Sequence, residues 1–194
     1  MKIKKLNYIL SCRKCGLHKF RRQVVLGRGV MPADVLFLGE GPGKSEDLTG
    51  EAFVGKAGRL LDKIVADAID KIITDYEAIC MSVMGELVKH LSFYITNVVL
   101  CHPTDKRFGD NRKPTEGEIF ACMGNVMEVY NRVKPKEVVF LGRVPEKYYK
   151  KEFPGGVYMY HPAFLERQGG QASPYYNTCV RTLEEVFRRI YAKD

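Results

Sequence analysis

Short apolar runs alternate with amphipathic stretches along most of the chain, and this alternation restricts the possible folds more than any other feature. The runs Asp34–Leu38, Phe93–Leu100, Glu137–Leu141 and Val157–Tyr160 are rich in β-branched and aromatic residues and predict buried strands. Between them, apolar residues recur every three or four positions, as in amphipathic helices. Such an order predicts an α/β domain with a mainly parallel, four-stranded sheet.

The helices are predicted over residues 55–74, about 76–90 and 174–192, with a further helix beginning at Thr115. Thr115 and Glu118 have the spacing of a capping box, in which each side chain accepts from the other residue's backbone amide. The buried stripe of that helix is predicted to hold Ile119, Phe120, Met123, Val126, Met127 and Tyr130. The inward residues of the last helix are predicted to be Val180, Leu183, Val186, Phe187 and Ile190.

The size and composition of the chain are those of one globular domain. Its 194 residues, of which 45% are hydrophobic, suffice for one core, so we expect a single domain over residues 1–194. No run of about 18 apolar residues occurs, and the basic N-terminal stretch is too short for a signal sequence. We therefore expect a cytoplasmic monomer with no membrane attachment.

The chain carries an excess of positive charge. Lys and Arg number 31 against 23 Asp and Glu, which gives a formal net charge of +8. A basic surface suits a polyanionic partner, because Lys and Arg contacts to phosphates release condensed counterions. An ordinary solvated basic surface accounts for the charge equally well, so charge alone does not identify a nucleic-acid partner.

Candidate functional residues follow directly after the predicted strands. They are Glu40–Gly43, Asn97–Cys101, Gly142 and His161 with Pro162. In parallel sheets ligands bind beyond the carboxyl ends of the strands, so we expect these segments to meet at one edge. The glycine-rich turn could cradle a phosphate, but it matches neither a dinucleotide fingerprint nor a Walker loop. His161 alone would more often be a structural histidine than a catalytic one.

Six cysteines in a chain of this kind favour metal ligation, catalysis or core packing over disulfides. Cys12 and Cys15 form a C-x-x-C pair, while Cys101 ends a predicted strand and Cys122 lies in the following helix. Together these four could supply thiolates to zinc or to a [4Fe–4S] cluster. The spacing of the cysteines alone hardly distinguishes these two kinds of metal centre. Four unrelated buried cysteines are the alternative. A thioredoxin-like pair is disfavoured, because Cys12 does not follow a strand.

A series of motifs in a fixed order resembles the family 4 uracil-DNA glycosylases, which carry an iron–sulfur cluster. The matching segments reach from about Ser11 to Arg167 and comprise Cys12–Leu17, Arg21–Gly27, Gly39–Gly43, Glu46 and Asp47 with Gly50, Phe53–Leu61, Tyr94–Val99, Asn111 and Arg112 with Pro114 and Thr115, and His161–Leu165. The resemblance implies a three-layer sandwich with the uracil pocket at the strand ends. Divergent phage-encoded and polymerase-associated relatives share this fold.

The resemblance also implies a cofactor. Cys12, Cys15, Cys101 and Cys122 would ligate a [4Fe–4S] cluster of structural function, with zinc the less favoured metal. Cys80 and Cys179 match nothing in the family pattern and are expected to be core residues.

By the same resemblance, each matched residue has a role in removing uracil from DNA. Phe53 would stack on the everted base, and the amide of Asn97 would read uracil by accepting from N3–H and donating to O4. His161 would donate to uracil O2 as negative charge develops on the leaving base. These expectations assign the substrate and the reaction, hydrolysis of the N-glycosidic bond of deoxyuridine.

The remaining expected site residues come from the glycine-rich turn and from the segment after His161. Gly41 and Gly43 would let backbone amides approach the base and a water. Glu46 would exclude the thymine methyl group or handle the water, and Glu40 would hold the turn. Leu165 and Arg167 would contact DNA and fill the space left by the flipped nucleotide.

The sequence departs from the family pattern at its DNA-facing rim. About five extra residues around Asp105–Gly109 lengthen the loop between Cys101 and Cys122, and the segment between Gly142 and His161 is short. Two alternatives to a uracil-DNA glycosylase therefore stay open. One is a non-catalytic iron–sulfur module that binds DNA, and the other is a glycosylase for another deaminated base.

Overall fold

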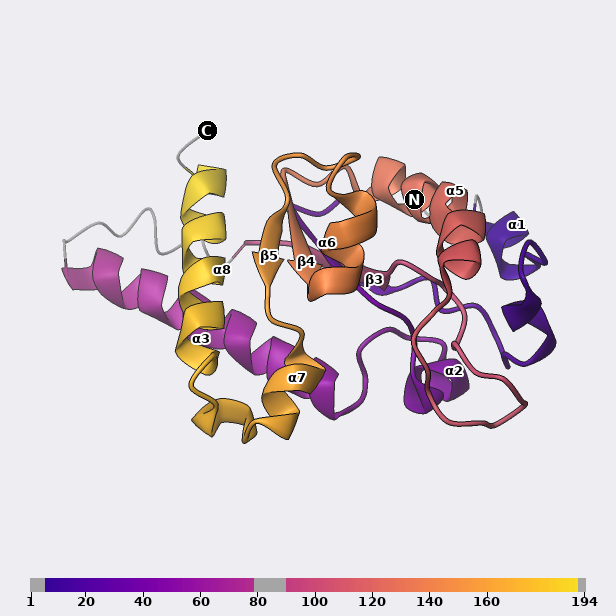
Figure 1. Cartoon of the computed structure of the whole chain (residues 1–194). Coiled ribbons are helices and arrows are strands. Elements are labelled where there is room, and N and C mark those ends of the chain that lie inside the picture. The colour runs from indigo at the N-terminus through magenta and orange to yellow at the C-terminus, as the bar shows by residue number, and fades with distance from the viewer. Residues whose placement is uncertain (1–5, 79–89, 192–194) are drawn as a thin grey trace.

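The computed structural model describes residues 6–78 and 90–191 and has a five-stranded sheet at its centre (Figure 1). The strand order is β1-β3-β2-β4-β5. The strands are β1 (Arg28–Gly29), β2 (Val35–Gly39), β3 (Phe93–Asn97), β4 (Glu137–Leu141) and β5 (Val157–Met159). The four longer strands are parallel, which confirms the predicted parallel sheet, and β1 adds a two-residue antiparallel edge on β3 that the sequence pattern did not reveal.

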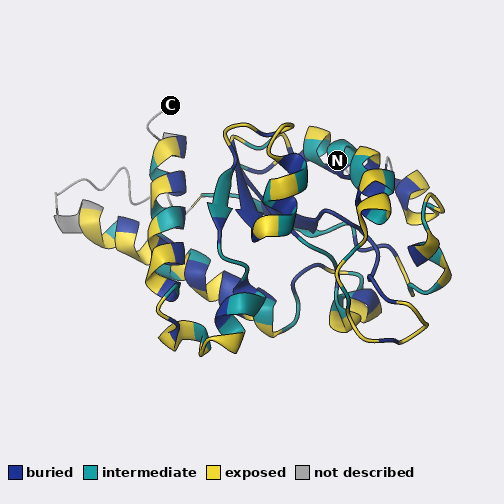
Figure 2. Cartoon of the chain, viewed as in Figure 1, coloured by how far each residue is buried: buried dark blue, intermediate teal, exposed yellow. Residues whose placement is uncertain are grey.

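Helices cover both faces of the sheet. One apolar core lies between the sheet and α3 (Lys56–Ala78), α7 (Pro162–Arg167) and α8 (Tyr176–Tyr191). The opposite core includes α1 (Asn7–Leu10), α5 (Glu116–Val133) and α6 (Arg143–Tyr149). β2 and β4 are buried throughout and β3 nearly so, whereas each long helix has one buried and one exposed side (Figure 2). The predicted three-layer sandwich is confirmed.

Consecutive strand residues serve the two cores in turn. In β2, Phe37 belongs to the core under α3 and α8, whereas Leu36 and Leu38 belong to the core under α5. Side chains alternate between the faces of a strand, so a strand buried on both faces reads as a continuous apolar run. For this reason the strands could be predicted from continuous apolar runs, although polar and apolar residues do not alternate in them.

Several predicted elements are confirmed and two need correction. The capping box is present, since the Glu118 amide donates to Thr115 and the Thr115 amide donates to Glu118. All five inward residues predicted for α8 are buried. Phe120 is not in the buried stripe of α5 but is 60% exposed, because Cys122, Asn125 and Val129 occupy the inner side.

The second correction concerns the segment from Phe93 to Leu100, in which β3 ends at Asn97. Residues 98–100 are buried but form a bend, although the Val98 amide still donates to Gly39 of β2, and their β-branched residues had suggested a longer strand. The predicted helix over 76–90 falls mostly outside the described residues, although α3 continues to Ala78.

Several short elements were not predicted. They include α2 (Lys44–Thr49), η2 (Gly16–Lys19) and η3 (Gly170–Ala172), together with α6. Each is seven residues or shorter, too short for a clear helical period in the sequence. Within the part of the chain that the structure describes, no helix combines the length and apolarity required to cross a membrane.

Candidate functional site

The carboxyl ends of the parallel strands carry the segments that the sequence singled out. In Figure 1, α2 after β2, α7 after β5 and the loop after β3 all lie at the lower end of the sheet. Gly39 and Asn97 are the last residues of β2 and β3 and are directly paired. The predicted gathering of these segments at one edge is therefore present in the fold.

Gly39 is the point at which two of the predicted site residues meet. A Cβ atom on Gly39 would lie 2.5 Å from Asn97 Oδ1 and 2.6 Å from the Phe53 ring. Any residue other than glycine would displace one of the two side chains. The close approach of Asn97 and Phe53 therefore depends on the absence of a side chain at the end of β2.

Asn97 presents a buried acceptor that the protein does not use. The side chain is 1% exposed, and among the described residues Oδ1 has no hydrogen-bond partner. A buried polar atom without a partner costs about 1–3 kcal/mol of stability. Such an atom at a sheet edge is suited to a ligand that brings its own donor.

Phe53 is fixed against His161 by its backbone. Its φ of +56° is unusual for a bulky residue and belongs to the left-handed region. The ring centroids of Phe53 and His161 are 5.9 Å apart with an interplanar angle of 31°. A Cβ atom on Gly58, in the first turn of α3, would overlap the Phe53 carbonyl, so this glycine lets the helix pack directly on the Phe53 backbone. Asn97, Phe53 and His161 thus converge from three distant segments.

His161 is held in a defined hydrogen-bonding state. It is the N-cap of α7, and its Nδ1 accepts from the Ala163 amide at 3.1 Å. A nitrogen that accepts carries no proton, so Nε2 bears the hydrogen of the neutral ring and is a donor. Burial, assisted by the positive charge of Arg167, lowers the pKa of His161 to about 4. The imidazole is therefore neutral at physiological pH.

Glu46 links the glycine-rich turn to the segment that carries Phe53. Its Oε2 accepts from the Gly43 amide at 3.0 Å and its Oε1 from the Gly55 amide at 2.9 Å. Charge-assisted bonds of this kind are stronger than neutral ones, so the carboxylate fixes the spacing of the two backbones. Each oxygen keeps further acceptor capacity for a water or a substrate group.

Gly41 and Glu40 lie in the same turn. A Cβ atom on Gly41 would lie 2.9 Å from Pro103 and 3.0 Å from Val99, so this position is closely packed against the segment after β3. Glu40 is half-buried, and burial raises the pKa of its carboxyl, an effect that Lys113 opposes. The turn therefore combines a closely packed backbone with a carboxyl group of raised pKa.

The structure separates the two residues that were expected to contact DNA. Arg167 is exposed at the end of α7. Leu165 is completely buried in the core shared with α3 and α8, so the prediction that it contacts DNA is wrong. The reason is the helical period of α7, which turns Leu165 toward the sheet while Arg167 points outward.

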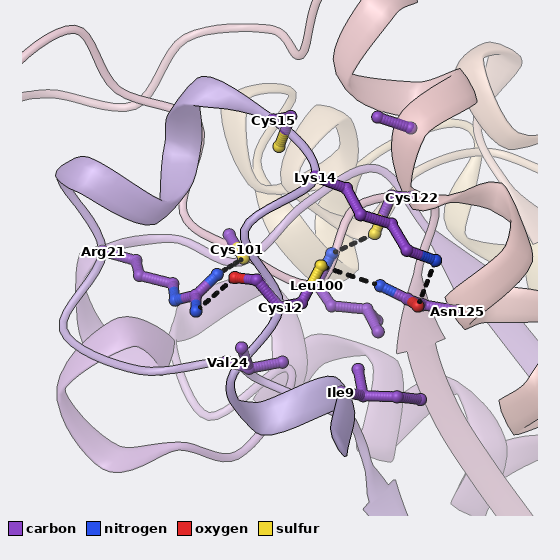
Figure 3. Close-up of a pocket in the computed structure, with 11 residues that line it drawn as sticks. Ile9, Cys12, Lys14, Cys15, Arg21, Val24, Leu100, Cys101, Cys122 and Asn125 are labelled. Atoms are coloured by element: carbon purple, nitrogen blue, oxygen red, sulfur yellow. Dashed lines mark hydrogen bonds between the residues drawn. The ribbon is translucent and has the colours of Figure 1, made fainter. Parts of the chain in front are cut away.

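Four cysteines from three segments line one pocket (Figure 3). Cys12 follows α1 and Cys15 precedes η2, while Cys101 follows β3 and Cys122 lies on α5. All four are free thiols, and the fifth described cysteine, Cys179, is buried in the opposite core as expected. Cys80 lies outside the described residues. The predicted grouping of the four thiols is thus reproduced by the fold.

Hydrogen-bond donors point at three of these sulfur atoms. Arg21 donates to Cys101 Sγ at 3.1 Å, the Asn125 amide to Cys12 Sγ at 3.3 Å and the Leu100 backbone amide to Cys122 Sγ at 3.4 Å. Donors at this position stabilise thiolates over thiols. Burial acts in the opposite direction and raises the pKa of Cys101 to about 11 and that of Cys122 to about 12. Thiolates here need a positive partner beyond Arg21, as a metal centre would provide.

The thiols surround a space and do not converge on one point. Among the described residues, no three His, Cys, Asp or Glu side chains are arranged to hold a metal ion. Four cysteines that line one pocket are the ligand set of a tetrahedral zinc site or of a polynuclear cluster.

Two residues around the pocket had no role predicted from the sequence. Asn125 stands one helical turn after Cys122 and also accepts from Lys14 at 3.2 Å, and Arg21 also donates to the Cys12 carbonyl at 2.7 Å. The only signal for Asn125 is a polar residue on the inner side of α5. Arg21 lies in a matched motif, but nothing in the sequence connects it with a sulfur atom.

Comparisons with known proteins agree on one family. A family model described as the uracil DNA glycosylase superfamily matches residues 26–184. The chain is 37% identical over 135 residues to a type-4 uracil-DNA glycosylase of Archaeoglobus fulgidus, covering 70% of this chain and 56% of the relative. Over 140 residues it is 36% identical to the enzyme of that name from Sulfurisphaera tokodaii, covering 72% and 54%.

A more extensive match is made to the type-4 uracil-DNA glycosylase of Saccharolobus solfataricus. That protein is 28% identical over 197 residues, covering 94% of this chain and 81% of the relative. The chain spans little more than half the length of the first two relatives.

Proposed function

Since the chain belongs to the uracil DNA glycosylase superfamily, we propose that it removes uracil from DNA by hydrolysing the N-glycosidic bond of deoxyuridine. The single observation that carries this proposal is the position of Phe53, whose ring meets Asn97 at Gly39 and lies 5.9 Å from the His161 ring, while Asn97 Oδ1 is buried with no hydrogen-bond partner among the described residues. Relatives named type-4 uracil-DNA glycosylases give the substrate class.

Asn97 is the residue that identifies the base. Uracil N3–H donates to Asn97 Oδ1, and the Asn97 amide donates to uracil O4. Cytosine has an acceptor at N3 and a donor at C4, so it would leave the buried amide unpaired. A site built to bond a polar group rejects an analogue that lacks it much more strongly than an apolar pocket rejects a missing methyl group.

Phe53 and His161 hold the base and stabilise its departure. The everted uracil stacks on the Phe53 ring, which exchanges stacking in the duplex for stacking in the protein. Water adds to C1′ of the sugar and releases its proton to solvent, and the electrons of the broken C1′–N1 bond leave with uracil. His161 Nε2–H donates to uracil O2, where the negative charge collects. A neutral donor suffices, in agreement with the lowered pKa of His161.

The carboxylates of the turn act on water and on the sugar. We assign Glu46 to holding the attacking water near the Gly43 amide, since its carboxylate already lies between the turn at Gly43 and the Phe53 segment at Gly55. Glu40 supplies further negative charge near the developing sugar cation. Gly41 serves by its lack of a side chain, which brings the turn against Pro103 and Val99. Arg167 contacts the DNA backbone.

The four cysteines are assigned to a [4Fe–4S] cluster. Cys12, Cys15, Cys101 and Cys122 would hold it, and the three donors that face their sulfur atoms support thiolate ligation. When bound, the cluster supplies cross-links between the N-terminal segment, the end of β3 and α5, and hydrolysis needs no electron transfer from it. Its contribution to the reaction is therefore the position of the segments around it.

Uracil excision is tested directly. Single- and double-stranded oligonucleotides with one deoxyuridine are incubated with the protein and treated with alkali, which cleaves at abasic sites. We expect cleavage at the uracil position and none at cytosine or thymine. Absence of cleavage, with retained DNA binding, would assign the chain to the non-catalytic alternative.

A further inference from the structure

An exposed aromatic ring stands at the tip of the loop after β3, and the function proposed above does not use it. Phe108 is 57% exposed and has a φ of +60°. It lies within the stretch of about five residues by which this loop exceeds the family pattern. An exposed Phe in the left-handed region has a conformational cost and, with this exposure, little gain from burial.

Positive charge surrounds the Phe108 ring. The Arg22 guanidinium carbon lies 4.5 Å from the ring centroid, and that of Arg107 lies 5.3 Å from it. Both arginines and Lys106 are exposed. The acidic residues of the loop are engaged elsewhere, since Asp105 pairs with Arg112 at 2.7 Å and Asp110 pairs with Lys44 at 2.7 Å. The tip therefore presents an aromatic ring among cations.

The loop is fixed at its base, so the ring has a defined position. Arg112 bonds both oxygens of Glu118 as well as Asp105, which joins the two ends of the loop to the start of α5. At the tip, the Gly109 amide and the Thr104 hydroxyl both donate to the Lys106 carbonyl. A side chain on Gly109 would overlap Thr104. An ordered surface loses less entropy on binding than a flexible one.

The tip also lies beside the candidate site. Asp110 pairs with Lys44, which directly follows Gly43, and the Arg22 backbone amide donates to Asp47 of α2. On the inner side of the loop, Asn111 accepts from His102 at 2.7 Å and approaches Gly43. The ring is therefore carried by the same segments that form the turn next to Asn97.

We propose that Phe108, with Arg22 and Arg107, is a stacking site for an unpaired nucleobase of the DNA strand, next to the uracil that is removed. An aromatic ring binds any base through its face, and arginines beside it contact the flanking phosphates. A protein partner would need an apolar surface that continues around the ring, whereas here the surroundings are cationic. The inference rests on the proposed function, because it places the uracil of the same strand at Asn97.

The test measures binding of a single-stranded oligonucleotide in which a 2′-fluorinated deoxyuridine prevents hydrolysis. A series of such oligonucleotides carries one abasic residue at each flanking position in turn. For the unmodified protein we expect an affinity loss of roughly 5- to 100-fold at one or two adjacent positions. Phe108→Ala should bind the complete oligonucleotide with an affinity reduced by the same factor. An abasic residue at the sensitive positions should cause no further loss of affinity in this variant.

Matched variants separate stacking from charge and from folding. Phe120→Ala removes an equally exposed phenylalanine from α5 and should bind like the unmodified protein. Phe108→Trp should retain the affinity. Arg107→Gln should weaken binding to every oligonucleotide and reduce the slope of log K against log salt by about one. Melting temperatures of the Phe108 variants should stay unchanged, since the ring is exposed.

The outcomes distinguish this inference from the proposed function. Equal binding by Phe108→Ala and the unmodified protein, or an equal effect of abasic residues at all positions, would overturn the stacking site while uracil release continues. Position-specific loss without uracil release from the unmodified protein would support the stacking site and refute the glycosylase.

Discussion

At the scale of single residues, Asn97 combines a cost in stability with a gain in recognition. Its Oδ1 is buried and has no partner in the described part of the chain. The family resemblance had assigned this amide to uracil, but its unpartnered state could not be predicted from sequence. Burial of an amide depends on the packing of Phe53 and Gly39, which lie 44 and 58 residues earlier in the chain.

Replacing Asn97 should therefore separate activity from stability. Asn97→Leu has a similar volume and removes the unpartnered oxygen. We therefore expect the free energy of unfolding in urea to be unchanged or to rise by up to about 1–3 kcal/mol. Uracil release should fall by roughly 100-fold or more, because the hydrogen bonds to the base are lost. A variant that loses stability and activity together would instead make Asn97 a structural residue.

His161 predicts a dependence of stability on pH. Its pKa is about 4 in the folded protein and about 6.5 in the unfolded chain. Between these values the unfolded state binds more protons, so this contribution is complete above pH 6.5 and is lost as the pH falls toward 4. The full shift corresponds to roughly 3 kcal/mol.

A matched variant isolates this contribution of His161. His161→Gln has no titrating ring, so between pH 7 and pH 4.5 the unmodified protein should lose about 2–3 kcal/mol more of its unfolding free energy in urea than the variant does. Parallel losses in the two proteins would contradict the lowered pKa.

At the scale of elements, the sequence predicted the strands and helices that have a regular pattern of buried residues. It did not predict side-chain positions that depend on contacts between segments. The strands β2 and β4 and the helix α8 were predicted because each fills a whole face with apolar residues. Leu165 was misassigned because its exposure depends on how α7 packs on α3, and Phe120 because apolarity alone does not orient a helix. The packing of α3 on the Phe53 backbone had no sequence signal beyond Gly58 itself.

The contact between α3 and Phe53 leads to a prediction with an internal control. In Gly58→Ala the new methyl group would overlap the Phe53 carbonyl, so α3 or Phe53 must shift. We expect a loss of about 1–3 kcal/mol in unfolding free energy, as for overpacked sites, and slower uracil release. Gly124→Ala lies inside α5, where the nearest atom is 4.0 Å from the new Cβ, and should gain about 0.5–1 kcal/mol.

A shift at Phe53 should appear mainly as weaker binding of substrate. The ring contributes its face to the base, so KM should rise more than kcat falls. Gly124→Ala should leave both unchanged. If the two alanine variants behave alike, the close contact between α3 and Phe53 does not control the site.

At the scale of the whole molecule, the four cysteines bring together three segments of the chain that also share one apolar core. The sequence suggested the grouping through the C-x-x-C pair and the family pattern, but left zinc and a cluster open. The fold shows that the thiols line one pocket and that Arg21, Asn125 and the Leu100 amide bond three of their sulfur atoms. Removing one ligand should therefore affect the N-terminal segment and the loop after β3 together.

Cys122→Ser tests this connection against Cys179→Ser, which changes another buried thiol, in the opposite core. Protein purified without oxygen should be brown and contain about four iron atoms per chain, and Cys179→Ser should keep them. Cys122→Ser should lose the iron and unfold at a clearly lower temperature, because metal binding contributes folding free energy that the apoprotein lacks. Protease should then cut first around Arg13 and in the loop near Arg107, since both segments lose their common attachment. Iron-free protein that melts and resists protease like the loaded form would show that the thiols are core residues with no connecting role.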